Sequence, residues 1–433
     1  MISRLIFILL LGAGTWLFTK NVRRIIRNIN LGRAVDRSDN PVKRWKTMAR
    51  VALGQSKMVT RPVAGIMHIF IYAGFIIINI EVLEIIVDGI FGTHRIFSFM
   101  GRFYNFLIGS FEILALLVTV GCVVFLIRRN ILRLKRFWMR EMTSWPRSDA
   151  NIILITEIAL MIFFTTMNAC DYLLQGMGNE HYITAGLFPV SSIWANLFAG
   201  HSEHTLILIE RFCWWAHIIG ILAFLNYVPY SKHFHIFLAF PNTYYSNLNS
   251  KGALTNLESV TTEVKLMLDP TATVTSSDTP QRFGAKDIFD LTWKQLMDAY
   301  SCTECGRCTS VCPANITGKL LSPRKIMMDT RDRLEEVGKN IDNNREFKDD
   351  SKTLLNNYIL PEELWACTTC NACVEACPVN IDPLSIIVDM RRYLVMEQGT
   401  APTELNGMFT KMENNAAPWP FAQTERLNWV NES

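Results

Sequence analysis

Two short cysteine-rich runs constrain the fold of this chain more than any other feature of its sequence. Both follow the spacing C-x2-C-x2-C-x3-C-P, and they are Cys302-Thr-Glu-Cys305-Gly-Arg-Cys308-Thr-Ser-Val-Cys312-Pro313 and Cys367-Thr-Thr-Cys370-Asn-Ala-Cys373-Val-Glu-Ala-Cys377-Pro378. This spacing is typical of paired [4Fe–4S] clusters, in which three cysteines of a run bind one cluster and the fourth binds its neighbour. The proline keeps the turn from closing onto the same cluster. The sequence therefore predicts two [4Fe–4S] clusters.

The spacing also predicts which cysteines share a cluster. One set is Cys302, Cys305, Cys308 and Cys377, and the other is Cys367, Cys370, Cys373 and Cys312. Crossed ligation of this kind holds two clusters close together, as an electron relay requires. A pair of zinc sites would explain neither the third C-x2-C step nor the repeated Cys-Pro. A disulfide framework would need an oxidising compartment.

Apolar stretches dominate the chain before residue 240. Of all residues, 50% are hydrophobic, and five stretches reach the length of about 20 residues that a bilayer-spanning helix needs. They are Ile2–Thr19, Val63–Val87, Tyr104–Ile127, Ile152–Leu174 and Thr205–Val228. The first stretch has the length of a signal peptide, but its basic cluster follows the apolar run and no cleavage site is visible, so we expect a retained anchor. Cys122, Cys170 and Cys213 lie in these stretches and are expected to be small buried residues.

Basic residues between the stretches predict the orientation in the membrane. Twelve Lys and Arg lie between the first and second stretches, against Asp36 and Asp39, and seven lie between the third and fourth. Because cytoplasmic loops are rich in Lys and Arg, we expect the N-terminus outside and the cysteine runs in the cytoplasm of a bacterium, beside its inner membrane. The modest net charge of +4 gives no sign of a nucleic-acid partner.

Histidines within or beside the apolar stretches are candidate haem ligands. A haem b needs two neutral imidazoles from different helices, and His68 lies about two turns inside the second stretch. Its partner is expected near the fifth stretch, where His217 lies in the middle and where His233 and His235 follow Pro229. His217 can pair with His68, serve a second haem or line a quinone pocket. The second stretch has no further histidine for a second haem, so one haem is expected.

Other ionisable residues in the apolar half have two interpretations. His94, His181, His201 and His204 lie in outer loops and are expected to be hydrogen-bonded interfacial residues. Glu81, Glu84, Glu112 and Glu157 lie within or near the ends of the apolar stretches. Such groups can serve a proton path or a quinone site, or can simply face water at the end of a helix.

The chain changes character after residue 240. Residues 241–285 are rich in Asn, Ser, Thr, Asp and Gly and are expected to be a linker, with one short helix near 258–268. Residues 286–433 are expected to form an α-helical di-cluster ferredoxin-like domain. Helices are predicted to begin at Pro323, Pro361 and Pro383, and the charged residues 331–353 to form a solvated face or loop. The expected fold class is all-α: a five-helix transmembrane bundle over residues 1–240, then this domain.

Several segments beyond the cysteine spacing carry a resemblance to known proteins. They are Trp293-Lys-Gln-Leu-Met-Asp-Ala-Tyr-Ser-Cys-Thr-Glu-Cys-Gly-Arg-Cys308, Cys312-Pro-Ala-Asn, Gly318-Lys-Leu-Leu-Ser-Pro-Arg324, Cys377-Pro-Val-Asn-Ile-Asp382 and the tail with Pro418, Trp419, Arg426 and Trp429. These segments resemble the iron–sulfur subunits of the heterodisulfide reductase group, of anaerobic glycerol-3-phosphate dehydrogenase and of electron-transfer-flavoprotein:quinone oxidoreductases. The five apolar stretches and Pro229-Tyr-Ser-Lys-His-Phe-His235 resemble the haem b membrane domain of the nitrate reductase gamma subunit type.

The chain departs from these families at two points. The membrane family often has two histidines on its second span, where this chain has only His68. Larger relatives continue into cysteine-rich CCG modules, and this chain reaches Ser433 without one. The resemblance therefore implies one haem b and a separate CCG-type iron–sulfur subunit.

The resemblance implies a respiratory electron-transfer subunit, an oxidoreductase component that reduces membrane quinone. Its donor would be electron-transfer flavoprotein or a CCG-type partner subunit. No flavin or nicotinamide fingerprint occurs in the sequence, so the organic chemistry of the donor is expected elsewhere. The alternatives are a quinol-oxidising subunit that feeds a heterodisulfide-reductase-type enzyme, a haem-free membrane anchor that carries the clusters, and a redox sensor.

Overall fold

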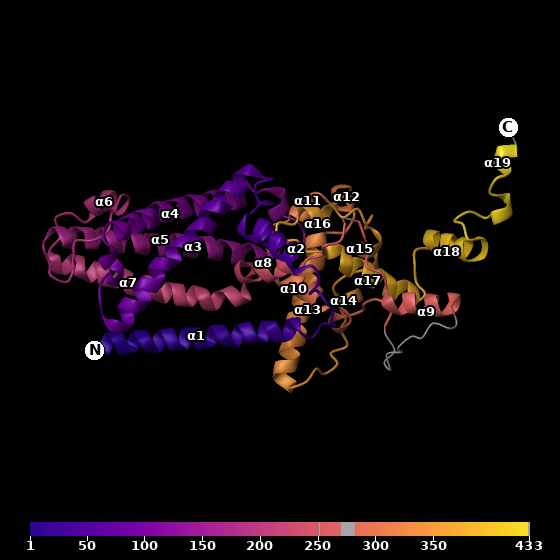
Figure 1. Ribbon diagram of the computed structural model, residues 1–433, viewed down its shortest axis with the longest axis horizontal. Helices are drawn as coiled ribbons and strands as arrows, with labels where there is room; N and C mark the ends of the chain where they lie inside the picture. The colour runs from indigo at the N-terminus through magenta and orange to yellow at the C-terminus, as the bar shows by residue number, and fades with distance from the viewer. Residues whose placement is uncertain (251, 270–281, 432–433) are drawn as a thin grey trace.

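The computed structural model describes residues 1–250, 252–269 and 282–431. Within these residues the regular secondary structure is helical, and the only β-bridges are isolated ones between Arg33 and Thr292 and between Leu355 and Ile359. The predicted all-α fold is therefore confirmed. The molecule is elongated: a bundle of long helices lies at one end, a cluster of shorter helices lies beside it, and α9, α18 and α19 extend beyond (Figure 1).

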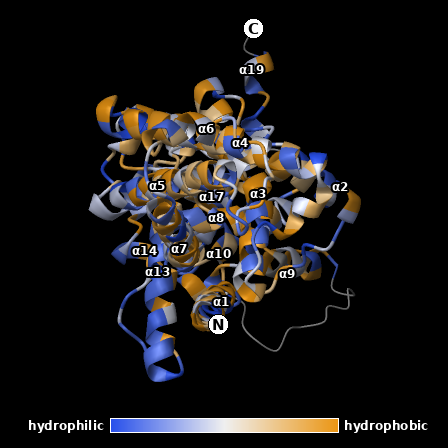
Figure 2. Cartoon of the chain, turned by 90° about the vertical axis from the view of Figure 1, so that its left-hand side faces the viewer, coloured by the Kyte–Doolittle hydropathy of each residue, from blue (hydrophilic) through white to orange (hydrophobic). Residues whose placement is uncertain are grey.

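Five helices are long and apolar enough to cross a membrane, as the sequence predicted. They form the bundle, in which α5 packs against α4 and α7, α4 packs against α3, and α1 contacts α7 and α3. Viewed from the end of the bundle, these helices carry mostly hydrophobic residues (Figure 2). The five are α1 (Ile2–Ile29), α3 (Pro62–Phe91), α4 (Arg102–Leu126), α5 (Ser144–Gly176) and α7 (Glu203–Tyr227).

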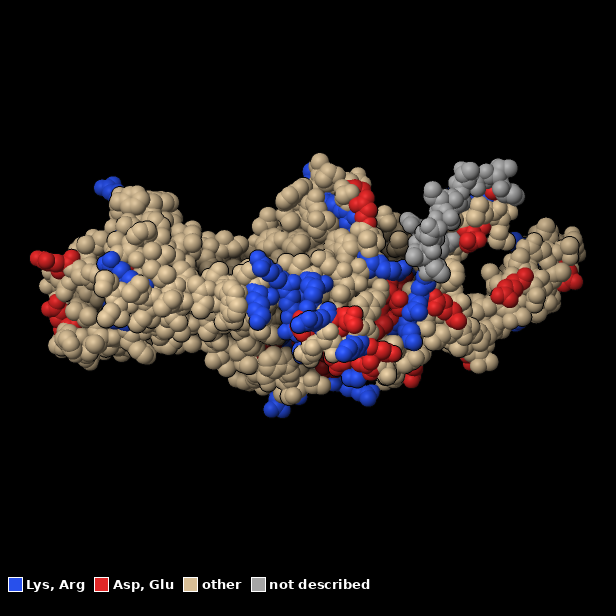
Figure 3. Space-filling view, turned by 90° about the horizontal axis from the view of Figure 1, so that it is seen from below, with Lys and Arg blue, Asp and Glu red and all other residues tan. Residues whose placement is uncertain are grey.

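Charged side chains are distributed differently on the bundle and on the rest of the molecule. On the face shown in Figure 3, the bundle has few charges, Lys and Arg gather where the bundle meets the rest of the molecule, and Asp and Glu are frequent beyond that point. Short segments connect the long helices: α2 (Pro41–Met48), α6 (Ser191–Trp194), the π-helices Ala49–Leu53 and Ile127–Ile131, and the 3-10 helices Ile96–Met100, Lys135–Phe137 and Ala195–Leu197.

After α7 the chain turns sharply before it reaches the cysteine runs. Pro229 lies in the 3-10 helix Val228–Tyr230, which is followed by the 3-10 helix Lys232–Phe234 and by α8 (His235–Tyr244). The kink expected at Pro229 is thus present, because proline cannot donate the hydrogen bond that a continuous helix requires. Helix α9 (Glu258–Leu268) corresponds to the short helix predicted in the linker.

The C-terminal half, residues 282–431, consists of short helices with clear starting signals. Ser322 caps α13 by accepting a hydrogen bond from the Lys325 amide, and Asp382 caps α17 in the same way. The helices are α10 (Trp293–Tyr300), α11 (Arg307–Ser310), α12 (Pro313–Ile316), α13 (Pro323–Asn344), α14 (Leu354–Asn357), α15 (Pro361–Trp365), α16 (Ala372–Ala376), α17 (Pro383–Met396), α18 (Thr403–Asn415) and α19 (Asn428–Asn431), with 3-10 helices Ile288–Asp290 and Gln423–Glu425. The starts predicted at Pro323, Pro361 and Pro383 are confirmed.

The core of the C-terminal half also contains residues from the bundle. Ile25, Ile29, Val228 and Phe234 are buried in the same apolar cluster as the residues around the cysteine runs. The Asn28 amide donates to the Tyr300 hydroxyl at 2.9 Å, and the Trp293 indole donates to the Val35 carbonyl at 3.0 Å. The end of α1 and the segment after it are therefore structural parts of the C-terminal half.

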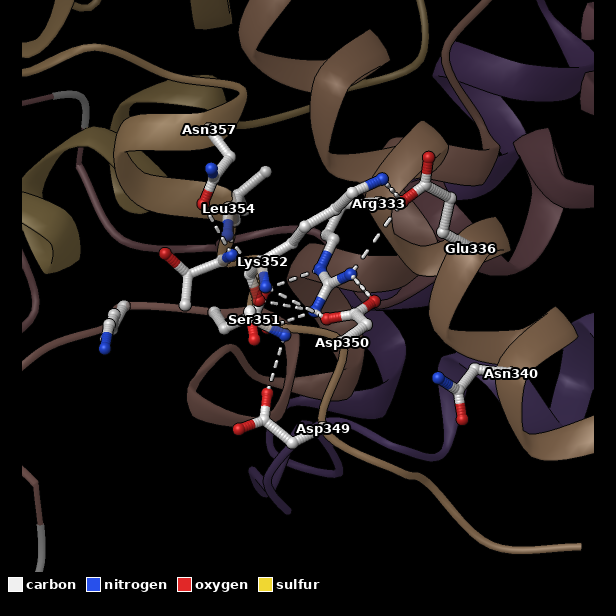
Figure 4. Close-up of polar contacts among 12 residues, drawn as sticks. Arg333, Glu336, Asn340, Asp349, Asp350, Ser351, Lys352, Leu354 and Asn357 are labelled. Carbon is white, nitrogen blue, oxygen red and sulfur yellow. Dashed lines mark hydrogen bonds and ion pairs between the residues drawn. The ribbon is translucent and has the colours of Figure 1, made fainter. Parts of the chain in front are cut away.

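Helix α13 is longer than the sequence predicted. The charged stretch 331–353 was expected to be a solvated face or loop, but α13 continues to Asn344 and Arg333 is fully buried. Arg333 donates to Asp287 at 2.9 Å and to the Lys352 carbonyl at 2.8 Å, and it also pairs with Asp350 (Figure 4). This arginine fixes the loop after α13 against the body of the C-terminal half.

Candidate electron-transfer site

The two cysteine runs fold into loops with the same backbone form. In the first loop, Glu304 and Gly306 have positive φ angles of 52° and 68°, and in the second Thr369 and Asn371 have 55° and 59°. Gly306 and Asn371 occupy the same position, directly after the second cysteine of each run. Glycine and asparagine are the residues that best tolerate this left-handed conformation. Each loop then continues into a short helix, α11 or α16, and these two helices pack against each other.

The loops bring thiols of different runs close together. Burial, and then the neighbouring thiols of Cys305 and Cys302, raise the pKa of Cys377 to about 12. Burial also raises the pKa of Cys367 and Cys373, and Cys312 is among the neighbours that add to both effects. Cys377 thus lies near Cys302 and Cys305 of the first run, and Cys312 lies near Cys367 and Cys373 of the second. This proximity supports crossed ligation, which stays a prediction.

The cysteines have the properties expected of cluster ligands. All eleven cysteines of the chain are free thiols, and Cys122, Cys170 and Cys213 are buried as expected. Backbone amides donate to two of the sulfurs, Thr369 to Cys367 at 3.4 Å and Ile381 to Cys377 at 3.3 Å, and such bonds tune cluster potentials. Among the described residues, no three His, Cys, Asp or Glu side chains are arranged to hold a single metal ion. The third C-x2-C step and the Cys-Pro of each run are what favour clusters over zinc ions.

The two loops differ in their exposure. Cys370 of the second loop is exposed to solvent, whereas in the first loop Cys302 is buried and Cys305 and Cys308 are partly buried. The first loop instead lies against the bundle, where the Arg307 guanidinium donates to the carbonyls of Lys57 and Met58 at 2.7 and 3.2 Å. The second loop is consequently the one that a soluble partner can reach.

Arg324 holds the first loop against the connection between α4 and α5. Its side chain is fully buried and donates to the Glu141 carboxylate and to the Arg136 carbonyl, both at 2.6 Å. It also donates to the carbonyl of Glu304 in the cysteine loop, at 3.4 Å. A Cβ atom at Gly306 would lie 2.5 Å from this guanidinium, so glycine is needed there for space as well as for its φ angle.

Lys232 connects the first cysteine loop to the candidate haem ligands. Its ammonium group pairs with the buried Glu304 carboxylate, which also accepts from Arg331 at 2.8 Å. The carbonyl of Lys232 lies 3.0 Å from Nδ1 of His235. Because a carbonyl can only accept, Nδ1 of His235 carries the proton and Nε2 keeps its lone pair. This is the usual arrangement of a histidine that binds a metal through Nε2.

A cavity of about 310 Å³ lies between the bundle and the first cysteine loop. Its wall includes His68 from α3, His233 and His235 from the segment after α7, and Cys305 from the first loop. The wall also includes Arg129 and Arg136, whose Nε atoms are buried without a hydrogen-bond partner among the described residues. A haem b fits this donor set, because His68 and His235 come from different helices and unpaired guanidinium groups suit its propionates.

The four candidate histidines do not all lie at this cavity. Among the described residues, the buried Nδ1 of His68 has no hydrogen-bond partner. The ring centroids of His233 and His235 are 5.5 Å apart. His217 is 2% exposed, lies 6.0 Å from the ring of Phe164 and is not part of the cavity wall. The cavity therefore gathers His68, His233 and His235 and leaves His217 inside the bundle.

Lys232, Glu304, Arg324 and Glu141 were not identified from the sequence as parts of the site. Lys232 and Glu304 are 72 residues apart in the chain, and Arg324 and Glu141 are 183 residues apart. Lys232, Glu304 and Arg324 did lie in segments that carry the family resemblance, but nothing in those segments indicates which side chains they contact.

Comparisons with known proteins agree with this site. Residues 301–381 match the family described as a 4Fe-4S dicluster domain. The chain is 27% identical to "Probable iron-sulfur-binding oxidoreductase FadF" of Bacillus subtilis, over 100% of this chain and 61% of that protein. It is also 27% identical to "EtfAB:quinone oxidoreductase" of Syntrophomonas wolfei, over 92% of this chain and 55% of that protein. This chain thus spans 55–61% of the length of these two relatives.

A shorter match is to "Probable membrane-anchored ferredoxin" of Chromohalobacter salexigens, 33% identical over 35% of this chain and 25% of that protein. No solved structure matches the chain. The expected resemblance to iron–sulfur oxidoreductases, including those that act on quinone, is confirmed by these relatives. The haem b part of the resemblance stays a prediction.

Proposed function

We propose that this chain is an electron-transfer subunit that links a cytoplasmic electron donor to membrane quinone. When bound, two [4Fe–4S] clusters and one haem b supply the one-electron chemistry that this role requires. The donor is electron-transfer flavoprotein or a CCG-type iron–sulfur subunit. The names of two relatives, an EtfAB:quinone oxidoreductase and an iron-sulfur-binding oxidoreductase, support this class of reaction.

One observation carries the proposal: a single cavity has histidines of the bundle and a cysteine of the first run in its wall. His68 and His235 would hold the haem through Nε2, with His235 oriented by the Lys232 carbonyl. Cys305 borders the same space. The ligands of the first cluster and of the haem would therefore be neighbours, which is what rapid electron transfer between two cofactors needs.

The exposure of the second loop indicates where the electron donor would bind. Cys370 is exposed, and the thiols of Cys302 and Cys377, which would hold the other cluster, are buried. A soluble donor would thus meet the second loop. We place this loop in the cytoplasm of a bacterium, with the N-terminus on the opposite side of its inner membrane, because the connections beside the C-terminal half carry the basic residues.

Quinone reduction in proteoliposomes tests this function. The purified full chain, in vesicles that contain a menaquinone or ubiquinone analogue, is supplied with reduced electron-transfer flavoprotein in the outside buffer. We expect oxidation of the flavoprotein to match reduction of the quinone, and we expect both to be lost in the His68→Ala variant. The matched control is His201→Ala, which changes a histidine in an exposed loop.

Two results would contradict the proposal. Quinone reduction that continues at the wild-type rate in His68→Ala would remove the haem from the path. Electron flow that occurs only from quinol to an added heterodisulfide-type acceptor would reverse the assigned direction.

A further inference from the structure

A group of buried carboxylates lies at the end of the bundle opposite the C-terminal half. Four acidic residues contribute to it from three helices: Glu81 and Glu84 from α3, Glu112 from α4 and Asp171 from α5. They are between 0 and 4% exposed and surround Arg95, which is itself 6% exposed. These five residues are called the carboxylate cluster below. The cluster adjoins α6, where the Ser191 amide donates to Glu112, and α6 lies at the end of the molecule away from α11 and α16 (Figure 1).

Arg95 occupies the centre of the carboxylate cluster. Its guanidinium donates to Asp171 at 2.6 Å, to the Tyr104 hydroxyl at 3.0 Å and to the Asn168 side-chain carbonyl at 3.0 Å. One ion pair, between Arg95 and Asp171, is therefore complete. The remaining three carboxylates have no such contact with this arginine.

The three other carboxylates differ in how well they are satisfied. Glu84 accepts from the Phe97 amide and from the Tyr104 hydroxyl, both at 2.9 Å. Glu112 accepts from the Val190 and Ser191 amides at 2.9 and 3.0 Å. Glu81 is the exception, because its Oε2 is buried and has no hydrogen-bond partner among the described residues.

The charges of the carboxylate cluster do not balance if every group is ionised. Four carboxylates would then surround a single guanidinium in a space that is almost closed to water. A buried ionised carboxylate needs an opposite charge or several hydrogen-bond donors, and otherwise it takes up a proton. Glu84 and Glu112 have such donors and Asp171 has Arg95. Glu81 has no ion pair, and its Oε2 has no hydrogen-bond donor, among the described residues, so it is the group on which a proton is best accommodated.

Two histidines lie between the carboxylate cluster and the solvent. Nε2 of His94 lies 3.5 Å from Asp171 and makes no hydrogen bond among the described residues, and the ring of His94 packs against that of His181 at 5.1 Å. His181 lies in an exposed loop. The neighbouring charged and titratable groups are Asp88 on α3, Tyr182 in the same loop as His181, and Glu210 and Arg211, which pair with each other on α7. The cluster thus has a polar route to one aqueous side.

We propose that the carboxylate cluster is a proton-binding site in which Glu81 carries the exchangeable proton and His94 and His181 connect it to the aqueous side opposite the C-terminal half. The site does not depend on the function proposed above, because none of its residues contacts the cysteine loops or the haem cavity. It would provide the chain with a means of exchanging protons on the side of the membrane away from the clusters.

Infrared difference spectroscopy of the full chain in lipid vesicles tests this site. A protonated carboxyl group gives a carbonyl stretching band that is separate from the bands of ionised carboxylates. We expect the wild-type chain to show this band, and we expect the band to shift when the buffer is changed from H2O to D2O. The band should be reduced in Glu81→Gln and unchanged in Glu180→Gln, which alters an exposed carboxylate in the loop beside His181.

The wild-type spectrum keeps the proposal falsifiable even if Glu81→Gln does not fold. Absence of the band in the wild type, or a band that never shifts in D2O, would overturn it. A band that appears only when Na+ is replaced by choline would show that a cation, and not a proton, balances the cluster. As a second variant, His94→Gln should keep the band and slow its shift in D2O, and an unchanged shift rate would contradict the route.

Discussion

At the scale of single residues, Lys232 has the most consequential position in the site. Its ammonium group pairs with Glu304 beside the first-run cysteines, and its carbonyl accepts the Nδ1–H of His235. A second carboxylate, Asp149, lies 3.7 Å from the same ammonium group. One residue therefore fixes the cysteine loop and the imidazole relative to each other.

We predict that Lys232→Met lowers the reduction potential of the first cluster. The change removes a buried positive charge and leaves two carboxylates nearby, so an added electron is less well stabilised. A loss of about 1 kcal/mol in electrostatic energy corresponds to a few tens of millivolts for one electron. A redox titration followed by electron paramagnetic resonance measures the shift. The control, Lys319→Met, changes an exposed lysine of the same half, and equal potentials in both variants would refute the prediction.

Crossed ligation gives a second prediction for single residues. Cys377→Ser should damage the cluster of Cys302, Cys305 and Cys308, because the Cys377 thiol lies near Cys302 and Cys305. Cys312→Ser should instead damage the cluster of the second run, since Cys312 is near Cys367 and Cys373. The two variants form a matched pair, and electron paramagnetic resonance distinguishes the two clusters. The reverse pattern of loss would show that each run binds its own cluster.

At the scale of secondary structure, Arg333 decides the shape of the loop that follows α13. We predict that Arg333→Met lowers the free energy of local opening of residues 345–353 by about 2 kcal/mol, because charged hydrogen bonds to Asp287 and Asp350 are lost. Hydrogen–deuterium exchange of these amides should then be roughly thirty times faster. Lys339→Met, at an exposed position of the same helix, should leave their exchange unchanged. Equal exchange in both variants would mean that Arg333 does not hold the loop.

The starts of helices were predictable from the sequence, and the end of α13 was not. Ser322, Asp382 and the prolines after them are local signals, and the structure uses them as N-caps and first helical residues. The charged residues 331–344 have no such local signal. Their helix is stabilised by contacts with Asp287 and with the loop around Asp350, which depend on the tertiary fold.

The candidate site was predictable where the type and spacing of its residues indicate a cofactor. The cysteine runs and His68, His233 and His235 could be found because their residue types and positions point to clusters and haem. The pairs Lys232–Glu304 and Arg324–Glu141 join distant parts of the chain, and no pattern in one sequence indicates them. For the carboxylate cluster, the sequence indicated that Glu81, Glu84 and Glu112 can serve a proton path or face water at a helix end, but it did not indicate that they gather around Arg95.

At the scale of the whole molecule, the contact between the bundle and the C-terminal half depends on buried ion pairs. Arg324 and Glu141 are 0% and 8% exposed and belong to the two different halves. Burial raises the pKa of Glu141, but the Arg324 guanidinium and the Ser322 hydroxyl lower it by more, so it lies below its usual value of 4.5. The ionised carboxylate is therefore the form that holds the halves together.

We predict that the stability provided by Glu141 depends on pH. Because its pKa in the folded protein is lowered, its contribution is complete above about pH 4.5 and is lost as the pH falls through the folded pKa. Glu141→Gln should cost about 2 kcal/mol near pH 7, and this cost should shrink at lower pH. Thermal unfolding of both proteins, followed by circular dichroism from pH 7 down to about pH 2, well below the usual carboxyl pKa, measures the difference. Glu346→Gln, at an exposed position, is the control, and a cost that does not change with pH would contradict the prediction.

The two cysteine loops, which lead into α11 and α16, lie together beside the bundle (Figure 1). The cavity with His68, His235 and Cys305 lies between the first loop and the bundle. The central claim is that the first cysteine loop and this cavity belong to one electron path, with a haem b held in the cavity.

Cofactor content of the purified full chain tests this claim most directly. Non-haem iron, acid-labile sulfide and haem are measured per chain, together with the dithionite-reduced minus oxidised spectrum, in the wild type and in His68→Ala. We predict about eight non-haem irons and one haem with b-type bands in the wild type, and the same iron without haem in the variant. Full iron content with no haem in the wild type, or unchanged haem in His68→Ala, would contradict the account.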